Sequence, residues 1–229
     1  MESIQLNNVT KSYREGNDYL HVLRNISITV NRGEFVAIIG PSGSGKSTFL
    51  SIAGALLQPT EGEVLINGKN IVGLNEKELS KIRLENIGFI LQTSNLIPYL
   101  TVLDQLLVVK KMKDSITSED KTYATELLTE IGLGEKLNKY PEQLSGGERQ
   151  RVAVARAFMN DPSIILADEP TASLDSSRAF EIVELIANGV KSRNKAAIMV
   201  THDERMLPYC DKVYEIKDGK LHFIKENTA

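Results

Sequence analysis

The chain has 229 residues, 41% of them apolar, and a formal net charge of −3. This length and composition are typical of one domain, or slightly more, with a substantial buried core. The slight acidity argues against a nucleic-acid-binding protein, whose surface is usually basic. The single cysteine, Cys210, cannot form an intrachain disulfide, which fits a reducing compartment such as the cytosol.

No segment of the sequence has the pattern of a targeting signal or a membrane span. The N-terminal sequence, MESIQLNNVTKSY, lacks the basic region and apolar core of a secretory signal. The longest apolar runs, such as 35–40 and 196–200, are far shorter than the roughly 20 residues that span a bilayer. We therefore expect any membrane role to depend on another chain.

The first third of the chain is expected to consist mainly of strands. Short runs rich in β-branched residues occur at 3–9, 25–30, 34–40 and 63–68, and the early ones are close enough in sequence to pair antiparallel. The run at 34–40 is apolar on both alternations, as in a strand buried on both faces. It leads through a glycine-rich turn into a predicted helix at 46–57.

The character of the sequence changes at about residue 93. Up to about 143, apolar residues recur at helical spacing, as in 101–112 and 119–133, and strand-like runs disappear. We expect residues 93–144 to form a helical subdomain inserted into a core made of 1–92 and 145–229. Together they would form the single domain 1–229.

Helices and strands are expected to alternate after this insertion, which predicts a parallel α/β sheet. The sequence ends in two alternating runs around Asp218-Gly219, which is typical of a hairpin. The expected elements in chain order are a helix at 147–160, a strand at 163–168, a helix at 177–193, a strand at 196–202 and a hairpin at 212–225.

The most specific motif is GPSGSGKS at 40–47, which fits the phosphate-binding pattern G-x-x-x-x-G-K-[ST] between a predicted strand and a predicted helix. Its glycines would let backbone N–H groups surround the phosphates. Lys46 could reach the β- and γ-phosphates, and the Ser47 hydroxyl could bind Mg²⁺. The alternative, a structural glycine-rich turn, fits the flanking elements less well.

Two acidic residues follow the predicted strand at 163–168, at the edge of the sheet where α/β proteins bind ligands. Asp168 is placed to hold Mg²⁺, directly or through water. Glu169 would point elsewhere and is a candidate base for an attacking water. The alternative is that both belong to a solvated loop.

Two further polar residues are expected near the same edge. His202 follows the predicted strand at 196–202 and could contact a γ-phosphate, although a histidine there is more often structural. Gln92 follows the sequence IGFIL and could report on the Mg²⁺ and water position, or it could be an ordinary surface glutamine.

A second candidate anion site lies in LSGGERQ at 144–150, where serine and glycine amides open a predicted helix. It has no lysine, and the phosphate-binding loop already accounts for one nucleotide in this chain. The residues alone do not say what this second site would bind.

Taken together, these motifs resemble the ATP-binding subunit of an ABC transporter over nearly the whole chain. The resemblance implies a P-loop NTPase core, the ABC nucleotide-binding domain, with an N-terminal antiparallel β subdomain and an inserted α-helical subdomain. The matching motifs are the Walker A loop GPSGSGKS, the Q-loop glutamine Gln92, the signature LSGGE (144–148), the Walker B segment IILADE, the D-loop SLD (173–175) and the switch histidine His202.

The resemblance also implies roles for individual residues in binding ATP and Mg²⁺. Tyr13 matches the aromatic residue that stacks on adenine, although it could be an ordinary strand-edge tyrosine. Glu169 matches the catalytic glutamate, and Asp175 matches the D-loop residue that links two nucleotide sites. ATP would be bound by Gly40, Ser42, Gly43, Ser44, Gly45, Lys46, Ser47 and Thr48, with Ser47, Gln92 and Asp168 at the metal.

The family arrangement implies an answer for LSGGERQ. Two copies would pack head to tail about a two-fold axis. Ser145, Gly146 and Gly147 of one copy would then cap the γ-phosphate that Lys46 of the other copy holds. ATP would thereby become part of the interface.

Within the superfamily, the chain is most similar to the group serving lipoprotein release, macrolide and peptide export, and haem export. ATPases of haem exporters are closest, through NLIPYL, YPEQLSGGERQRVAVARAFMNDPSIILADEPTASLD and THDER. The chain departs from the group at Leu91, where an aromatic residue is common, and at Ser173, where an asparagine is common. Both departures affect which substrate the resemblance suggests, and neither affects the chemistry that it implies.

The resemblance further implies an integral membrane permease, which would hold the chain at the inner face of the cell membrane, in the cytoplasm. We expect the permease to dock on the helical subdomain within residues 93–102, near Leu96 to Leu100, unless those residues only pack the subdomain itself. No nucleic-acid partner is expected.

Other functions were weighed against haem export. Export of macrolides or antimicrobial peptides, lipoprotein release, or gating of a cell-division complex would use the same motifs. DNA-repair ATPases place a long coiled coil between the motifs, and ribosome-acting ABC factors carry two cassettes, so both fit less well. The cargo, the permease and the direction of transport, beyond resemblance, are left open.

Overall fold

The fold was derived from a computed structural model, which describes residues 2–16 and 18–227. Within these described residues, ten strands form two sheets. The antiparallel sheet has the order β2-β1-β4-β5, and the larger sheet has the order β10-β9-β3-β8-β7-β6. The strands are β1 (Glu2–Glu15), β2 (Asp18–Asn31), β3 (Phe35–Ile39), β4 (Glu61–Ile66), β5 (Lys69–Asn70), β6 (Ile87–Ile90), β7 (Ile164–Asp168), β8 (Ala196–Val200), β9 (Lys212–Lys217) and β10 (Lys220–Glu226).

Strands β6, β7, β8, β3 and β9 run parallel, and β10 returns antiparallel to β9. The parallel strands therefore present their carboxyl ends at one edge of the larger sheet. The helices are α1 (Lys46–Ala53), α2 (Glu76–Asn86), α3 (Val102–Lys113), α4 (Ser118–Glu130), α5 (Gly146–Phe158) and α6 (Ser176–Ser192), with short 3₁₀ helices η1 (Gly134–Lys136), η2 (Pro141–Gln143) and η3 (Glu204–Tyr209).

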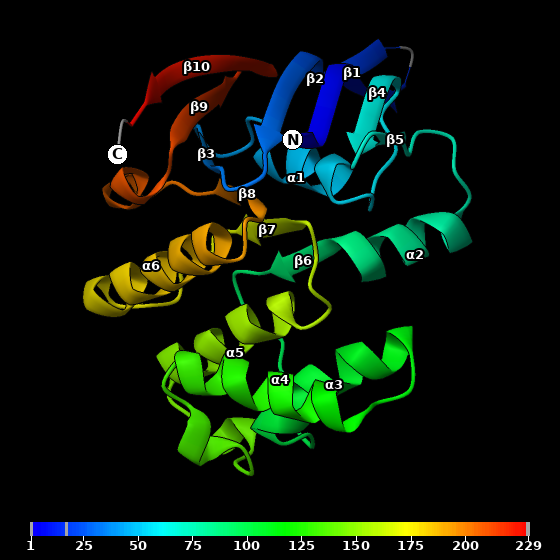
Figure 1. The fold of residues 1–229 in the computed structure, drawn as a ribbon. Coiled ribbons are helices and arrows are strands. Elements are labelled where there is room, and N and C mark those ends of the chain that lie inside the picture. The colour runs from blue at the N-terminus through cyan, green and yellow to red at the C-terminus, as the bar shows by residue number, and fades with distance from the viewer. Residues whose placement is uncertain (1, 17, 228–229) are drawn as a thin grey trace.

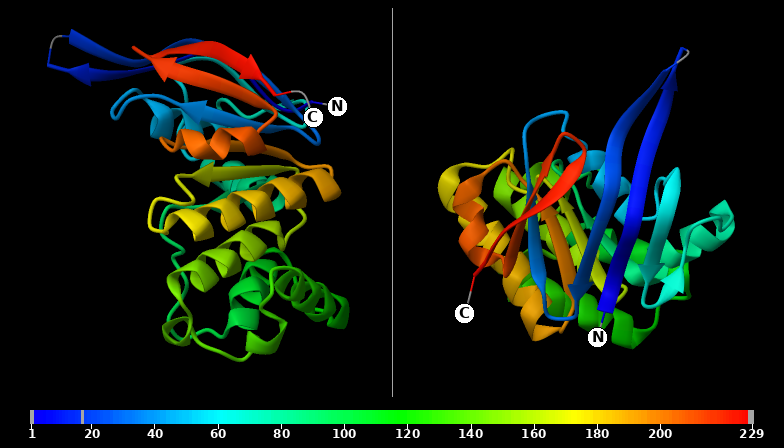
Figure 2. Two further views of the ribbon diagram at one scale, coloured as in Figure 1. Left: turned by 90° about the vertical axis from the view of Figure 1, so that its left-hand side faces the viewer. Right: turned by 90° about the horizontal axis from the view of Figure 1, so that it is seen from above.

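The molecule is layered around two hydrophobic clusters, one on each face of the larger sheet (Figure 1). On one face, α1 packs between the larger sheet and the antiparallel sheet, so that Phe49 and Ile52 are buried from both sides. On the other face, α5 and α6 cover the sheet, and α3 and α4 pack beyond them. Figure 2 shows the paired strands β1 and β2 extending past the rest of the molecule at their Glu15 and Asp18 ends.

The expected fold class is confirmed: a mixed α/β core carries an antiparallel β part and a helical part. The hairpin at Asp218-Gly219 is also confirmed, with φ of 50° and 75° at these two residues, as its turn requires. Helices α3 and α4 lie inside 93–144, but the boundaries of the helical subdomain stay a prediction.

Strands β5 and β6 and the three short 3₁₀ helices of the described residues were not expected from the sequence, and two α-helices differ from the expectation. The helix expected at 46–57 ends at Ala53, because Gly54 is its C-cap and Ala55 adopts a left-handed φ of 55°. The absence of a side chain at Gly54 leaves room for the Phe89 ring, which would lie 2.5 Å from a Cβ there. Helix α2 was not expected from the sequence. Its mean hydropathy is low and only Leu79 and Ile82 are buried, but a capping box at Asn75 stabilises its start.

A candidate nucleotide site

The loop between β3 and α1 is shaped by glycines that no other residue could replace without movement. Gly40 and Gly45 have φ of 145° and 105°, a region that L-residues with side chains rarely adopt. A Cβ on Gly40 would lie 2.2 Å from the Ile216 carbonyl oxygen, and one on Gly45 would lie 2.9 Å from the Val22 carbonyl oxygen. The loop therefore passes directly against β9 and β2.

This loop presents an anion-binding helix start. Helix α1 has no side-chain cap and no acidic residue in its first turn, so its first N–H groups are free to bind an anion. The Lys46 ammonium donates to the carbonyl oxygens of Gly40 and Pro41, both at 2.8 Å. It is thereby held over the loop.

The loop opens into a pocket of about 390 Å³ at the carboxyl edge of the larger sheet. The chain reaches this pocket from four places: β2, the β3–α1 loop, the end of β7 and the end of β8. The lining residues are Val22, Gly40, Ser42, Gly43, Gly45, Lys46, Ser47, Thr48, Asp168, Glu169, Val200 and His202. Val22 was missed from the sequence, and nothing in its local pattern marks it.

Asp168, the last residue of β7, faces the phosphate loop. Burial raises the pKa of its carboxyl above the ordinary value, the neighbouring Glu169 carboxylate raises it further, and the Lys46 ammonium opposes both. The Ser47 hydroxyl lines the same pocket. Hydroxyl and carboxylate oxygens are the donors that Mg²⁺ prefers, together with substrate phosphates, so these two residues fit a magnesium site.

Glu169 turns out of the strand towards β8. Its φ is 46°, and its N–H donates to the Val200 carbonyl oxygen at 2.9 Å. This turn brings Glu169 Oε2 to 2.8 Å from His202 Nδ1, and the His202 N–H also donates to Oε2 at 3.4 Å. The Glu169 side chain is 17% exposed and that of His202 is 69% exposed. A carboxylate and an imidazole are thus joined at the mouth of the phosphate loop.

Five of the expected sites are not among the residues that line this pocket: Ser44, Gln92, Tyr13, the residues 145–147, and Asp175. Gln92 is exposed beyond β6, and its carbonyl oxygen lies 3.5 Å from the Ser173 hydroxyl, which donates to it. Tyr13 lies on β1 with its ring 43% exposed, and the Lys11 ammonium is 5.1 Å from the ring centroid.

The side chains of Ser145 and Asp175 are used locally as helix caps. Ser145 begins α5 with a capping box, in which its hydroxyl accepts from the Glu148 N–H and Glu148 accepts from the Ser145 N–H. Asp175 accepts from the Arg178 N–H at the start of α6. The Ser-x-x-Glu spacing that predicts a capping box is present in SGGE, although the sequence interpretation used only its anion-binding potential.

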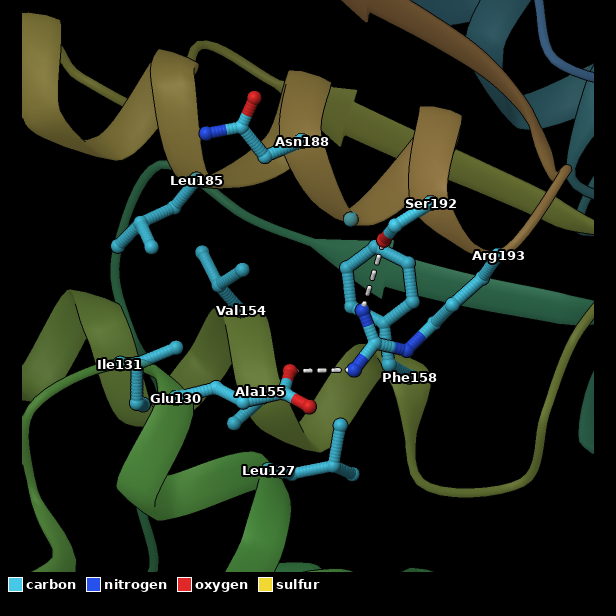
Figure 3. Close-up of a pocket in the computed structure, with 11 residues that line it drawn as sticks. Leu127, Glu130, Ile131, Val154, Ala155, Phe158, Leu185, Asn188, Ser192 and Arg193 are labelled. Carbon is cyan, nitrogen blue, oxygen red and sulfur yellow. Dashed lines mark hydrogen bonds and ion pairs between the residues drawn. The ribbon is translucent and has the colours of Figure 1, made fainter.

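A second pocket, of about 210 Å³, lies between α4, α5 and α6, away from the phosphate loop (Figure 3). The Arg193 guanidinium crosses its edge, pairs with Glu130, and lies 5.5 Å from the centroid of the Phe158 ring. Gly189 allows this packing, because a Cβ there would be 2.8 Å from the ring. The pocket therefore marks a junction between α4 and the core helices.

The comparisons with known proteins agree with this geometry. Residues 23–172 match the family described as "ABC transporter". The chain is 51% identical to the "Putative hemin import ATP-binding protein HrtA" of Staphylococcus haemolyticus, with 96% of this chain and 99% of that protein covered. It is 48% identical, with the same coverage, to the protein of that name from Staphylococcus aureus.

Solved structures match over almost the whole chain. One is the dimeric, post-hydrolysis state of the ATP-binding cassette MJ0796 bound to ADP and Pi, with a TM-score of 0.86, 41% identity, and coverage of 99% of this chain and 100% of that chain. Another is cbiO1 from Clostridium perfringens, part of the ABC transporter complex cbiONQ, with a TM-score of 0.86, 27% identity, and coverage of 99% and 89%.

Proposed function

The chain belongs to the ABC transporter family as an ATP-hydrolysing subunit, and on that premise we propose that two copies enclose two MgATP and drive the export of haem through a separate permease. The observation that carries the proposal is the convergence of Lys46, Asp168, Glu169 and His202 on one pocket. The dimeric state described for MJ0796 supports the pairing of two copies.

Within the pocket, each residue has a proposed part in hydrolysis. The phosphate-loop amides from Gly43 to Thr48 bind the phosphates, and Lys46 neutralises charge that develops on them. Ser47 and Asp168 hold Mg²⁺, and Gln92 reaches it from the loop beyond β6. When bound there, Mg²⁺ would act as a Lewis acid that offsets the negative charge of the phosphates.

Glu169 is the proposed base. Its carboxylate would accept a hydrogen bond from the attacking water and orient it in line with the scissile bond. As an imidazolium, His202 would donate from Nδ1 to Glu169 and from Nε2 to the γ-phosphate. Its bond to Glu169 fixes the two side chains relative to each other. Loss of either Glu169 or His202 would therefore disturb the position of the other side chain.

The second half of the site is proposed to come from the other copy. Ser145, Gly146 and Gly147 would offer the start of α5 to the γ-phosphate, and Asp175 would link the two sites. This accounts for an anion-binding sequence that lies outside the chain's own pocket. Tyr13, exposed on β1, would stack on the adenine ring, where such stacking contributes about 1–3 kcal/mol per base.

The membrane permease is proposed to dock on the helical part near Leu96 to Leu100. Tyr99 is 81% exposed there, whereas Leu96 packs partly against the hydrophobic cluster under the helices. In the part of the chain that the structure describes, no helix is long and apolar enough to cross a membrane. The chain would therefore lie at the inner face of the cell membrane through its permease.

The cargo is proposed from the relatives. Both HrtA proteins are named for hemin, and the sequence resembles ATPases of haem exporters. The names of these relatives specify import, whereas we propose export, so the direction of transport needs its own test. The permease is expected to set both cargo and direction, because no haem pocket is proposed on this chain.

Growth of a deletion strain tests cargo and direction together. If the chain drives haem export, the strain is inhibited by haem at concentrations that the parent tolerates, and the wild-type gene restores growth while a Glu169→Gln gene does not. An importer would instead leave the deletion strain unable to use haem as its iron source. Normal growth under both conditions would contradict haem transport and direct attention to peptide, macrolide or lipoprotein cargo.

A further inference from the structure

The loop that follows β6 is anchored to helix α5 by two polar side chains. Gln150, which is 2% exposed, donates its Nε2 to the Leu91 carbonyl oxygen at 3.0 Å. Arg156 donates Nη2 to the Ser94 carbonyl oxygen at 2.7 Å and Nη1 to the Asn95 carbonyl oxygen at 3.0 Å. Gln92 lies between these anchored residues, so both sides of it are fixed to one helix.

Arg156 is an unusual residue to find in this place. Burial lowers the pKa of its guanidinium, and among residues 2–16 and 18–227 no carboxylate lies within ion-pair distance of it. A partly buried cation without an acidic partner is costly unless other groups accept its hydrogen bonds. The carbonyl oxygens of Ser94 and Asn95 accept these hydrogen bonds. A planar guanidinium with several fixed donors suits two neighbouring carbonyl oxygens better than an ammonium would.

Helix α5 connects the Gln92 loop to the LSGG segment. A Cβ on Gly88 would lie only 2.2 Å from the Ala157 carbonyl oxygen, so the end of α5 sits directly on β6. From there the helix runs 13 residues, which is about 20 Å, to its cap at Ser145. The residues that hold the Gln92 loop and the LSGG segment are therefore on one rigid element.

We propose that Arg156 is a positioning residue for ATP hydrolysis, which fixes Gln92 relative to the start of α5. When the LSGG segment of this chain is placed against a nucleotide, the same helix also positions Gln92 of this chain. The inference rests on the proposed role of Gln92 at the metal, and it adds the residue that places this glutamine. Gln150 contributes to the same positioning through its hydrogen bond to the Leu91 carbonyl oxygen.

Arg156→Lys tests the proposal, since it keeps the charge and much of the stem but loses the paired geometry. The expected result is a fall in kcat on the order of tenfold, as for a small misplacement of a reacting group, with nucleotide affinity and melting temperature near those of the wild type. Arg83→Lys is a matched control, because Arg83 also donates to a backbone carbonyl, that of Ala55 at 2.8 Å, away from the site. Its kcat should be unchanged.

A double-mutant comparison separates positioning from general structure. In a Gln92→Ala background, Arg156→Lys should lower kcat no further, because its effect passes through Gln92. An equal loss in both backgrounds, or a wild-type kcat for Arg156→Lys, would overturn the inference and leave the proposed role of Gln92 intact. A wild-type rate for Gln92→Ala alone would overturn both.

Gln150→Met provides a second route if Arg156→Lys is poorly folded. This change removes the bond to the Leu91 carbonyl oxygen without altering charge. It should also lower kcat in the wild-type background and not in the Gln92→Ala background. The opposite pattern, with a loss that persists without Gln92, would count against positioning.

Discussion

His202 Nδ1 lies 2.8 Å from Glu169 Oε2, joining the ends of two neighbouring parallel strands at the mouth of the phosphate loop. The contact depends on the left-handed turn at Glu169, whose φ of 46° directs the carboxylate towards β8 rather than along β7. Asp168, one residue earlier, faces Lys46 instead. Two adjacent acids are thereby given different partners, which supports the different parts proposed for them.

Glu169→Gln should abolish most of the turnover while leaving ATP binding intact. The amide keeps the size of the side chain but cannot accept a proton, and removal of a general base typically costs 10²- to 10⁴-fold, here expected as a loss on the order of 10²-fold or more. Steady-state hydrolysis and equilibrium binding of ATP measure the two effects separately. Hydrolysis at the wild-type rate would remove Glu169 from this role.

The pKa of Asp168 should respond in opposite directions to its two charged neighbours. Its raised pKa comes from burial first and from the Glu169 carboxylate second, while the Lys46 ammonium lowers it. Removing the neighbouring negative charge by Glu169→Gln should therefore lower the pKa, and removing the positive charge by Lys46→Met should raise it.

A ¹³C NMR titration of the nucleotide-free protein measures these shifts directly. The wild-type carboxyl should titrate above 3.8, the ordinary value. Below its pKa the protonated group is a poor ligand, so Mg²⁺-dependent ATP affinity should also fall as pH falls through that value. Shifts of the same sign in both variants would contradict the charge arrangement described here.

The core chemistry could be predicted from the sequence because it is encoded locally. GPSGSGKS specifies a loop whose glycines and lysine act within eight successive residues, and the acids of IILADE follow a strand that is apolar throughout. Contacts between distant segments could not be predicted in this way. Val22 reaches the pocket only because β2 crosses above the loop, and Arg156 meets the carbonyls of 94 and 95 only after α5 folds onto β6.

Predictions from local sequence patterns were also incomplete where tertiary packing determines the structure. The predicted helix at 46–57 is shortened by the left-handed turn at Ala55, next to Gly54, which lies against the ring of Phe89 far away in sequence. Ser145 and Asp175 were interpreted through a partner copy, yet within the chain their side chains first serve as helix caps. A capping role and a role at an interface are compatible, since the capping box uses the N–H groups of Ser145 and Glu148 and not those of Gly146 and Gly147.

Tyr99→Asp should weaken capture of the permease without unfolding the chain. Tyr99 is 81% exposed, so a charge there costs little stability, whereas Leu96→Asp would also disturb the hydrophobic cluster. Met112, 71% exposed on α3, offers a control in Met112→Asp, which should bind the permease normally. Undiminished capture by folded Tyr99→Asp in a pull-down would exclude docking at this residue.

The most direct test of the account is whether the LSGG segment of one copy completes the nucleotide site of another. Glu169→Gln protein, which should retain ATP, is expected to form a dimer when ATP is added. Adding Gly147→Asp places a carboxylate where the γ-phosphate of the other copy is proposed to lie. Gly147 is buried, and the three atoms nearest to a Cβ there belong to the half-exposed Arg178 side chain, the closest being Cδ at 3.1 Å, so this flexible side chain would have to move aside. The melting temperature of the variant checks that the monomer stays folded. Ser80→Asp is the control variant, because it adds the same charge at an exposed position of α2, away from the LSGG segment.

Sedimentation velocity with and without ATP gives the answer. Glu169→Gln protein is expected to form an ATP-dependent dimer, and the Glu169→Gln, Ser80→Asp double variant is expected to do the same. The Glu169→Gln, Gly147→Asp double variant is expected to remain a monomer at the same ATP occupancy. A dimer of the Gly147→Asp variant at the ATP concentrations that suffice for its parent would contradict the shared site.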